Sequence, residues 1–153
     1  MAGCYTDVMA PEIRAPISID EFWHLAHRLP DAELSDTGFI LSRDPPTVRG
    51  PDVAVVLRDR VPSPVPAKFF PGPPDLAVEV LSPDDRPGEV AAKVADYLRA
   101  GAQAVWIVDP DARTVTVHTS RGAAPYERHE ILHGAPPLPA FELTLQTLFA
   151  EID

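Results

Sequence analysis

The stretch Pro74-Asp75-Leu76-Ala77-Val78-Glu79-Val80-Leu81-Ser82-Pro83 places one carboxylate, Glu79, in the middle of an apolar run. Residues 75–81 otherwise have the pattern of a buried strand. A buried carboxylate without a partner is costly in free energy, so it normally acquires a cation, a metal ion or a proton. Glu79 is therefore the first candidate for a functional residue.

A second run of the same kind lies upstream, where Pro51-Asp52-Val53-Ala54-Val55-Val56-Leu57 again has a Pro-Asp pair followed by apolar residues. This run supplies a second carboxylate, Asp52. Because side chains alternate faces along a strand, we expect Asp52 and Glu79 on the same face of adjacent strands, close enough to share one cation. Asp75 is expected to have a structural role, with a place beside the metal as the alternative.

The segment from Pro87 to Ala100 is predicted to be a helix, because its apolar residues recur at helical spacing. Those residues are Val90, Val94, Tyr97 and Leu98. Gly101 stands just beyond them, where a helix commonly ends. Lys93 and Tyr97 are four residues apart, so they are neighbours on the surface of the predicted helix.

A competing motif is His129-Glu130-Ile131-Leu132-His133, which matches the H-E-x-x-H pattern of zinc metallopeptidases. In that chemistry, two histidines one helical turn apart hold the zinc ion. Gly134, Pro136 and Pro137 follow at once, and no long amphipathic helix surrounds the motif. If residues 127–133 are extended, the two histidines are separated by about 13 Å of backbone. We therefore expect them not to converge on a metal.

The remaining pattern predicts a mixed sheet and proline-rich loops. The expected strands are residues 52–57, 75–81, 104–109 and 114–119, with Trp106 in the core and a hairpin turn at 109–113. The chain has 19 prolines. Their clusters, at 45–46, 62–66, 71–74 and 136–139, are expected to mark loops, of which the segment from Pro62 to Pro74 is the longest.

Several of these segments together resemble the Uma-two type of restriction-endonuclease-like proteins, within the PD-(D/E)XK nuclease superfamily. The resemblance covers about residues 36–150, and its central block is 74–110. The segments that carry it are Asp36-Thr37-Gly38-Phe39, Thr47-Val48-Arg49-Gly50-Pro51-Asp52, the stretch 74–83, Lys93 with Tyr97, Gly101 with Val105-Trp106-Ile107-Val108-Asp109-Pro110, Leu138-Pro139-Ala140-Phe141 and Leu148-Phe149.

The resemblance implies an α+β fold, a restriction-endonuclease-like mixed central β-sheet flanked by helices. It implies a metal-dependent endonuclease in which Asp52 and Glu79 bind Mg²⁺ or Mn²⁺, and in which Asp52, Glu79 and a lysine are catalytic. Such a cation prefers oxygen ligands and lowers the pKa of the attacking water. The expected partners are nucleic acid, with DNA preferred, and a second copy of the chain in a homodimer.

The sequence departs from the superfamily pattern at the lysine position. The superfamily has this lysine two residues after the second acid, where this chain has Leu81. Leucine can neither bind phosphate nor polarise water, so we expect Lys93 on the next helix to supply the cation. The alternative is a non-catalytic binding or assembly module that has kept the nuclease fold.

The N-terminal segment, residues 1–35, is a second departure and is expected to be divergent or shortened. Family members have a hairpin and a long helix there, whereas Ser18–Leu29 is predicted to form one short helix. Ser18 and Glu21 have the spacing of a capping box. Capping is preferred for Glu21 over replacement of a missing catalytic acid.

Length and composition indicate one domain over residues 1–153, with a cytoplasmic location. Cys4 is the single cysteine, which excludes an internal disulfide and fits a reducing compartment. No apolar run is long enough to span a membrane. The net charge of −10, from 13 basic and 23 acidic residues, opposes binding of a polyanion unless positive charge is locally concentrated.

Overall fold

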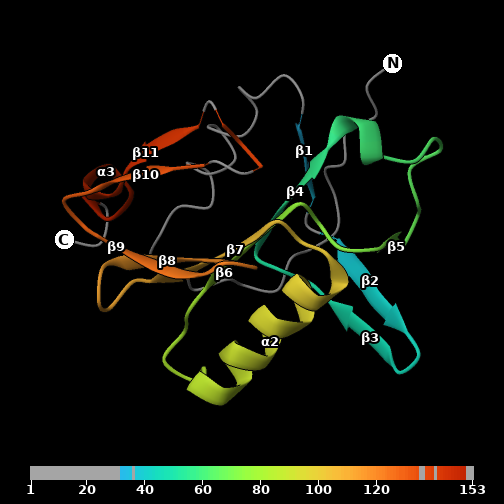
Figure 1. Ribbon diagram of the computed structural model, residues 1–153, viewed down its shortest axis with the longest axis horizontal. Helices are drawn as coiled ribbons and strands as arrows, with labels where there is room; N and C mark the ends of the chain where they lie inside the picture. Colours follow the sequence, from blue (N-terminus) through green and yellow to red (C-terminus); the bar gives the residue numbers. More distant parts are fainter. Residues whose placement is uncertain (1–31, 36, 135–136, 140, 151–153) are drawn as a thin grey trace.

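The computed structural model describes residues 32–35, 37–134, 137–139 and 141–150 (Figure 1). In chain order the elements are β1 (Ala32–Ser35), β2 (Gly38–Arg43), β3 (Pro46–Arg49), β4 (Val53–Leu57), the 3₁₀ helix η1 (Arg58–Arg60), β5 (Phe69–Pro71), β6 (Leu76–Val80), α2 (Pro87–Ala100), β7 (Ala104–Asp109), β8 (Thr114–Thr119), β9 (Gly122–Glu127), β10 (Ile131–His133), β11 (Glu142–Thr144) and α3 (Leu145–Leu148). None of the described helices is long and apolar enough to cross a membrane.

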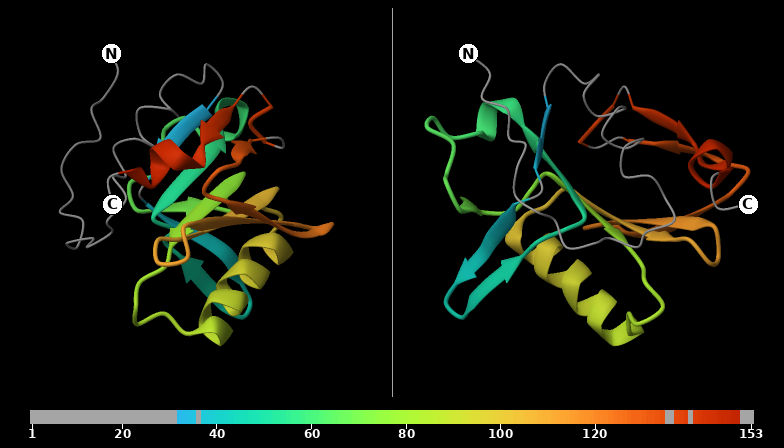
Figure 2. Two further views of the ribbon diagram at one scale, coloured as in Figure 1. Left: turned by 90° about the vertical axis from the view of Figure 1, so that its left-hand side faces the viewer. Right: turned by 180° about the vertical axis from the view of Figure 1, so that it is seen from behind.

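The central sheet has six strands in the order β1-β4-β6-β7-β8-β9. Within this sheet, among the described strands, only β6 and β7 pair in parallel, and α2 forms the crossover between them. The other neighbours are antiparallel. Helix α2 lies on one side of this sheet, and β10, β11 and α3 lie on the other (Figure 2). The expected α+β architecture with a mixed central sheet is confirmed.

Helix α2 has the predicted bounds, Pro87–Ala100. Proline is favoured at the first position of a helix because its fixed φ suits the helix and its missing N–H is not needed there. Gly101 ends the helix with a φ of 113°. Glycine adopts this left-handed conformation without the steric cost that a side chain adds. The helix packs on the sheet through Val94 and Tyr97, which are buried.

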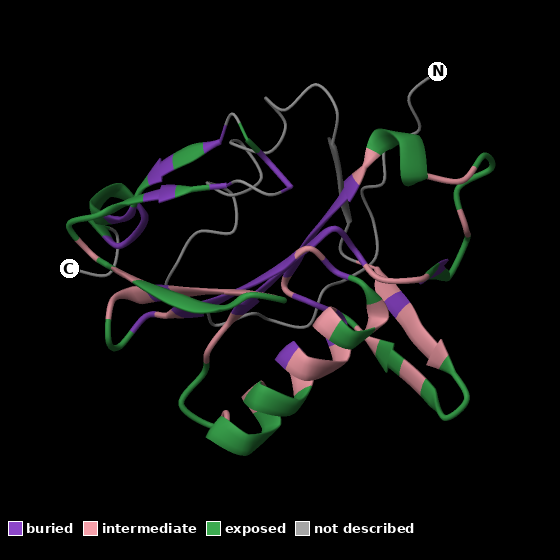
Figure 3. Ribbon diagram, viewed as in Figure 1, coloured by how far each residue is buried: buried purple, intermediate pink, exposed green. Residues whose placement is uncertain are grey.

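Successive side chains of β6 point to opposite faces of the sheet and pack in two different hydrophobic clusters. Leu76 and Val78 pack with the C-terminal elements, whereas Ala77 packs beneath α2. The central strands are accordingly buried on both faces (Figure 3). Trp106 of β7 is 1% exposed and its ring lies 5.6 Å from that of Phe141, so its predicted core position is confirmed.

The predicted strands correspond to β4, β6, β7 and β8, but several elements escaped prediction. The segment from Pro62 to Pro74 is not a continuous loop, because it contains β5, which pairs in parallel with β2. Phe70 is buried there while Phe69 is half-exposed. Strand β9 lacks apolar alternation and gains its structure by pairing with β8. The helix predicted at Ser18–Leu29 lies outside the described residues.

Asp75 joins three parts of the chain, as its preferred structural role implied. Its Oδ2 lies 2.8 Å from Nη1 of Arg60 and accepts a 2.8 Å hydrogen bond from the Leu57 N–H. Its Oδ1 accepts a 3.0 Å bond from the side chain of Gln103. The Asp75 side chain is only 5% exposed, so its charge depends on these donors.

Replacing Asp75 by Ala should lower the free energy of unfolding by about 3 kcal/mol, because three donors to a buried charge lose their acceptor. Urea unfolding measures this change. The control is Ala at the neighbouring exposed Asp59, where we expect a change of no more than about 0.5 kcal/mol. Equal effects of the two substitutions would contradict the structural role of Asp75.

Candidate active site

The register between β4 and β6 places the two predicted acids opposite each other. Val53 pairs with Val78 and Ala54 with Ala77. One residue further along the same register, Asp52 stands opposite Glu79. Since Ala77 faces α2, the alternation along β6 puts Glu79 on that face as well. Both acids therefore lie on the α2 side of adjacent strands, as expected.

Glu79 is 6% exposed and is held by two donors from α2. The Tyr97 hydroxyl donates a 3.0 Å hydrogen bond to Oε1. The Lys93 ammonium lies 3.2 Å from Oε2. The predicted approach of Lys93 toward Glu79 is therefore confirmed, in place of a surface pair with Glu89.

Asp52 is held by the backbone of the neighbouring acidic strand. Its Oδ2 accepts a 2.6 Å hydrogen bond from the N–H of Val80, the residue after Glu79. This bond fixes the start of β4 relative to the end of β6. Each carboxylate oxygen can accept more than one partner, so this bond leaves Asp52 able to bind a cation.

The site holds more negative than positive charge in a partly desolvated place. Burial raises the pKa of Asp52, against the opposing effects of the Val80 N–H and the Lys93 charge. Burial also raises the pKa of Glu79, with Lys93 opposing this shift and the Asp52 charge adding to it. Neighbouring carboxylates with raised pKa values are typical of functional sites. A bound cation would offset their negative charge and favour their ionised forms.

Tyr97 is the part of the site that sequence reasoning missed. It was recognised as a neighbour of Lys93, but no contact with Glu79 was predicted. Burial and the Glu79 charge raise the pKa of its hydroxyl, which therefore remains a donor at neutral pH. A buried tyrosine hydroxyl requires a hydrogen-bond partner, and an apolar strand containing one carboxylate offers such a partner.

The H-E-x-x-H motif is not helical. A turn lies between β9 and β10, so residues 127–133 do not form one continuous strand. Glu130 closes that turn by accepting a 2.7 Å hydrogen bond from the Glu127 N–H. His133 lies 3.3 Å from Glu142, and His129 lies 3.9 Å from Glu127. Across the part of the chain that the structure describes, no group of three or more His, Cys, Asp or Glu is placed to hold a metal ion.

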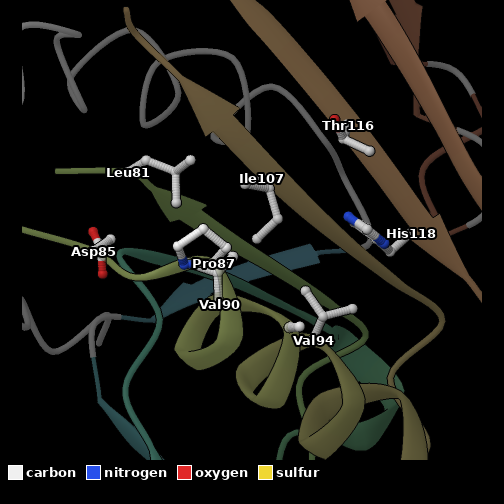
Figure 4. Close-up of a pocket in the computed structure, with 9 residues that line it drawn as sticks. Leu81, Asp85, Pro87, Val90, Val94, Ile107, Thr116 and His118 are labelled. Carbon is white, nitrogen blue, oxygen red and sulfur yellow. The ribbon is translucent and has the colours of Figure 1, made fainter. Parts of the chain in front are cut away.

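An apolar groove of about 320 Å³ lies on the other flank of α2, between the helix and strands β7 and β8 (Figure 4). Leu81 lines it, so the position that carries lysine in the superfamily pattern contributes to an apolar wall. Asp85 and His118 also line the groove, at opposite ends of it (Figure 4). Burial lowers the pKa of His118, which favours the neutral imidazole.

Comparisons with known proteins agree with this architecture. The family described as "Uma2: Putative restriction endonuclease" matches residues 18–148. This match begins before residue 36, so it includes part of the segment that was expected to diverge. A solved structure of a "putative nuclease belonging to DUF820" from Anabaena variabilis has a TM-score of 0.79 and 20% identity, covering 95% of this chain and 87% of that one. No curated protein matches the chain.

The raised pKa of Asp52 predicts that its charge destabilises the fold. Between its usual pKa of 3.8 and the higher folded value, the folded chain binds more protons than the unfolded chain. Stability is therefore lost as the pH rises through the folded pKa. Asn at position 52 can still accept the Val80 hydrogen bond, so Asp52→Asn should be more stable than the native chain at pH 7, with the gain vanishing toward pH 4.

Urea unfolding between pH 4 and pH 8 measures this difference. Asp52→Ala is the matched control, because it removes both the charge and the acceptor for Val80, and it should be less stable than Asp52→Asn by about 1 kcal/mol. If Asp52→Asn is less stable than the native chain at pH 7, the ionised carboxylate supports the fold and the prediction is wrong.

Proposed function

The chain belongs to the Uma2 family, as its sequence resemblance predicted, and on this premise we propose that it is a metal-dependent endonuclease that hydrolyses phosphodiester bonds in DNA. The observation that carries the proposal is the placement of Asp52 opposite Glu79, with Lys93 in contact with Glu79. Two carboxylates and one ammonium in a partly desolvated place are the groups that this hydrolysis requires.

The donor set fits a hard divalent cation. Mg²⁺ prefers oxygen ligands and is commonly held by one or two carboxylates, with water completing its octahedral shell. Asp52 and Glu79 would hold the ion, and their raised pKa values indicate a site with unneutralised negative charge. When bound, Mg²⁺ or Mn²⁺ supplies a Lewis acid that polarises a phosphoryl oxygen and acidifies a water molecule.

The remaining groups of the site have distinct roles in this proposal. Lys93 presents a compact positive charge that stabilises the negative charge developing on the phosphate or on the attacking hydroxide. Tyr97 keeps Glu79 in one orientation through the hydrogen bond to Oε1. The Val80 N–H does the same for Asp52. The acids are thus oriented before substrate binds.

The net charge limits how the substrate can be held. At −10 the chain as a whole repels a polyanion, so attraction has to come from the site itself. Lys93 and the bound cation would provide it at the acid pair. An interface with few cations releases few counterions, so the affinity for DNA should depend only weakly on salt concentration.

Substitution of Lys93 tests the catalytic proposal. Lys93→Met should lower the rate of Mn²⁺-dependent cleavage by about 10²-fold or more, because a group that stabilises developing charge is lost. Binding of Mn²⁺, measured by calorimetry, should remain. Asp52→Asn and Glu79→Gln should lose both binding and cleavage. The control is Met at Lys68, the other lysine of the chain, and it should cleave at the native rate.

The same measurements separate the catalytic proposal from its alternative. Native protein that binds Mn²⁺ but cleaves neither single- nor double-stranded DNA would favour a binding module with a retained fold. Full cleavage by Lys93→Met would instead show that this lysine is not the missing cation of the superfamily pattern.

A further inference from the structure

One ion pair outside the acid site connects two of the three chain segments that build it. Arg49 of β3 donates from Nε and Nη2 to Oδ2 of Asp96 on α2, at 3.1 and 2.7 Å. Both side chains are partly buried, at 34% and 22% exposed. The pair is therefore better ordered, and less screened by solvent, than a pair of fully exposed side chains.

The two partners occupy informative places in the sequence. Arg49 is three residues before Asp52, and the link between them contains the buried Pro51, whose ring fixes its φ. Asp96 lies on α2 directly before Tyr97 and three residues after Lys93. The ion pair thus links the segment that carries one acid to the helix that carries both partners of the other acid.

Apolar packing also joins α2 to the β2–β3 hairpin, because Leu41 of β2 packs against the same cluster as Val94 and Tyr97. Val94 and Tyr97 hold α2 against β6 and β7, and such contacts are non-directional. Arg49 donates two charge-assisted hydrogen bonds to one oxygen of Asp96, and such directional contacts resist sliding of the helix along the sheet. The Arg49 charge also lowers the pKa of the Tyr97 hydroxyl against the larger effects that raise it, so Arg49 lies within electrostatic reach of that group.

We propose that Arg49 is a positioning residue, whose ion pair with Asp96 holds α2 at the place where Lys93 and Tyr97 both reach Glu79. The effect on turnover rests on the proposed nuclease function. The effect on the contact between Tyr97 and Glu79 does not rest on that function, because the contact is present in the folded chain without substrate or metal.

Arg99 offers a matched control. It also approaches Asp96, with Nη1 at 3.6 Å from Oδ1, but it stands on the same helix and its side chain is 76% exposed. It therefore cannot connect α2 to β3. Arg99→Met removes a positive charge beside the same carboxylate without removing the link.

The experiment compares Arg49→Met, Asp96→Asn, Arg99→Met and the charge-swapped pair Arg49→Asp/Asp96→Arg in the full chain. The first readout is the NMR signal of ¹³Cζ-labelled Tyr97, assigned by its loss in Tyr97→Phe, because its chemical shift reports the hydrogen bond to Glu79. The second is kcat and KM for Mn²⁺-dependent DNA cleavage. Thermal unfolding verifies that each variant is folded.

We expect Arg49→Met and Asp96→Asn to shift the Tyr97 signal and to lower kcat by about 10–10²-fold with KM within about twofold, since misplacement by about 1 Å can cost that much. Arg99→Met should match the native chain in both readouts. The charge-swapped pair should recover the Tyr97 signal and most of kcat. If Arg49→Met fails to fold, Asp96→Asn and the swapped pair provide the same comparison.

Two results would overturn the proposal. One is an unchanged Tyr97 signal in folded Arg49→Met and Asp96→Asn. The other is a rise in KM at constant kcat in Arg49→Met, which would make Arg49 a substrate-binding group. If the native chain cleaves no DNA, the nuclease function fails, while the Tyr97 signal still decides whether Arg49 positions the helix.

Discussion

A carboxylate in the middle of a buried strand is the constraint on which the rest of this structure depends. Glu79 cannot keep its charge on β6 without donors, and the donors come from α2 as the Lys93 ammonium and the Tyr97 hydroxyl. This requirement is met because α2 lies over the strand and directs Lys93 and Tyr97 to Glu79. The facing acid, Asp52, takes its hydrogen bond from the backbone next to Glu79.

The proposed use of Lys93 in place of an in-line lysine has a physical basis. Leu81 follows the end of β6 and lies on the α2 side of the sheet, as Glu79 does, where it contributes to the apolar groove along α2. The loop after β6 returns the chain at once, so a lysine two turns into the helix reaches the acid with its flexible stem. The Lys93 ammonium therefore approaches Glu79 from the helix that packs on the sheet, and its position depends on the position of α2 relative to β6.

Sequence patterns predicted the elements whose signals are local, and missed those that depend on distant partners. Helix α2 has its apolar spacing, its N-terminal proline and Gly101 within one short segment, and its bounds were predicted correctly. Strand β5 is three residues long among prolines and exists because it pairs with β2. The contact of Tyr97 with Glu79 likewise joins residues of two elements, and the residue pattern of neither segment predicts it.

The antiparallel pairing of β4 with β6 also bears on how the chain avoids misfolding. A shift of the pairing by one residue would turn every side chain of the shifted strand to the opposite face. Glu79 would then face the apolar cluster beneath the C-terminal elements, where Leu76 and Val78 now pack. A charge in that place has no donor from α2, so the shifted arrangement is heavily penalised. The burial of Glu79 thus favours the native strand register over a pairing shifted by one residue.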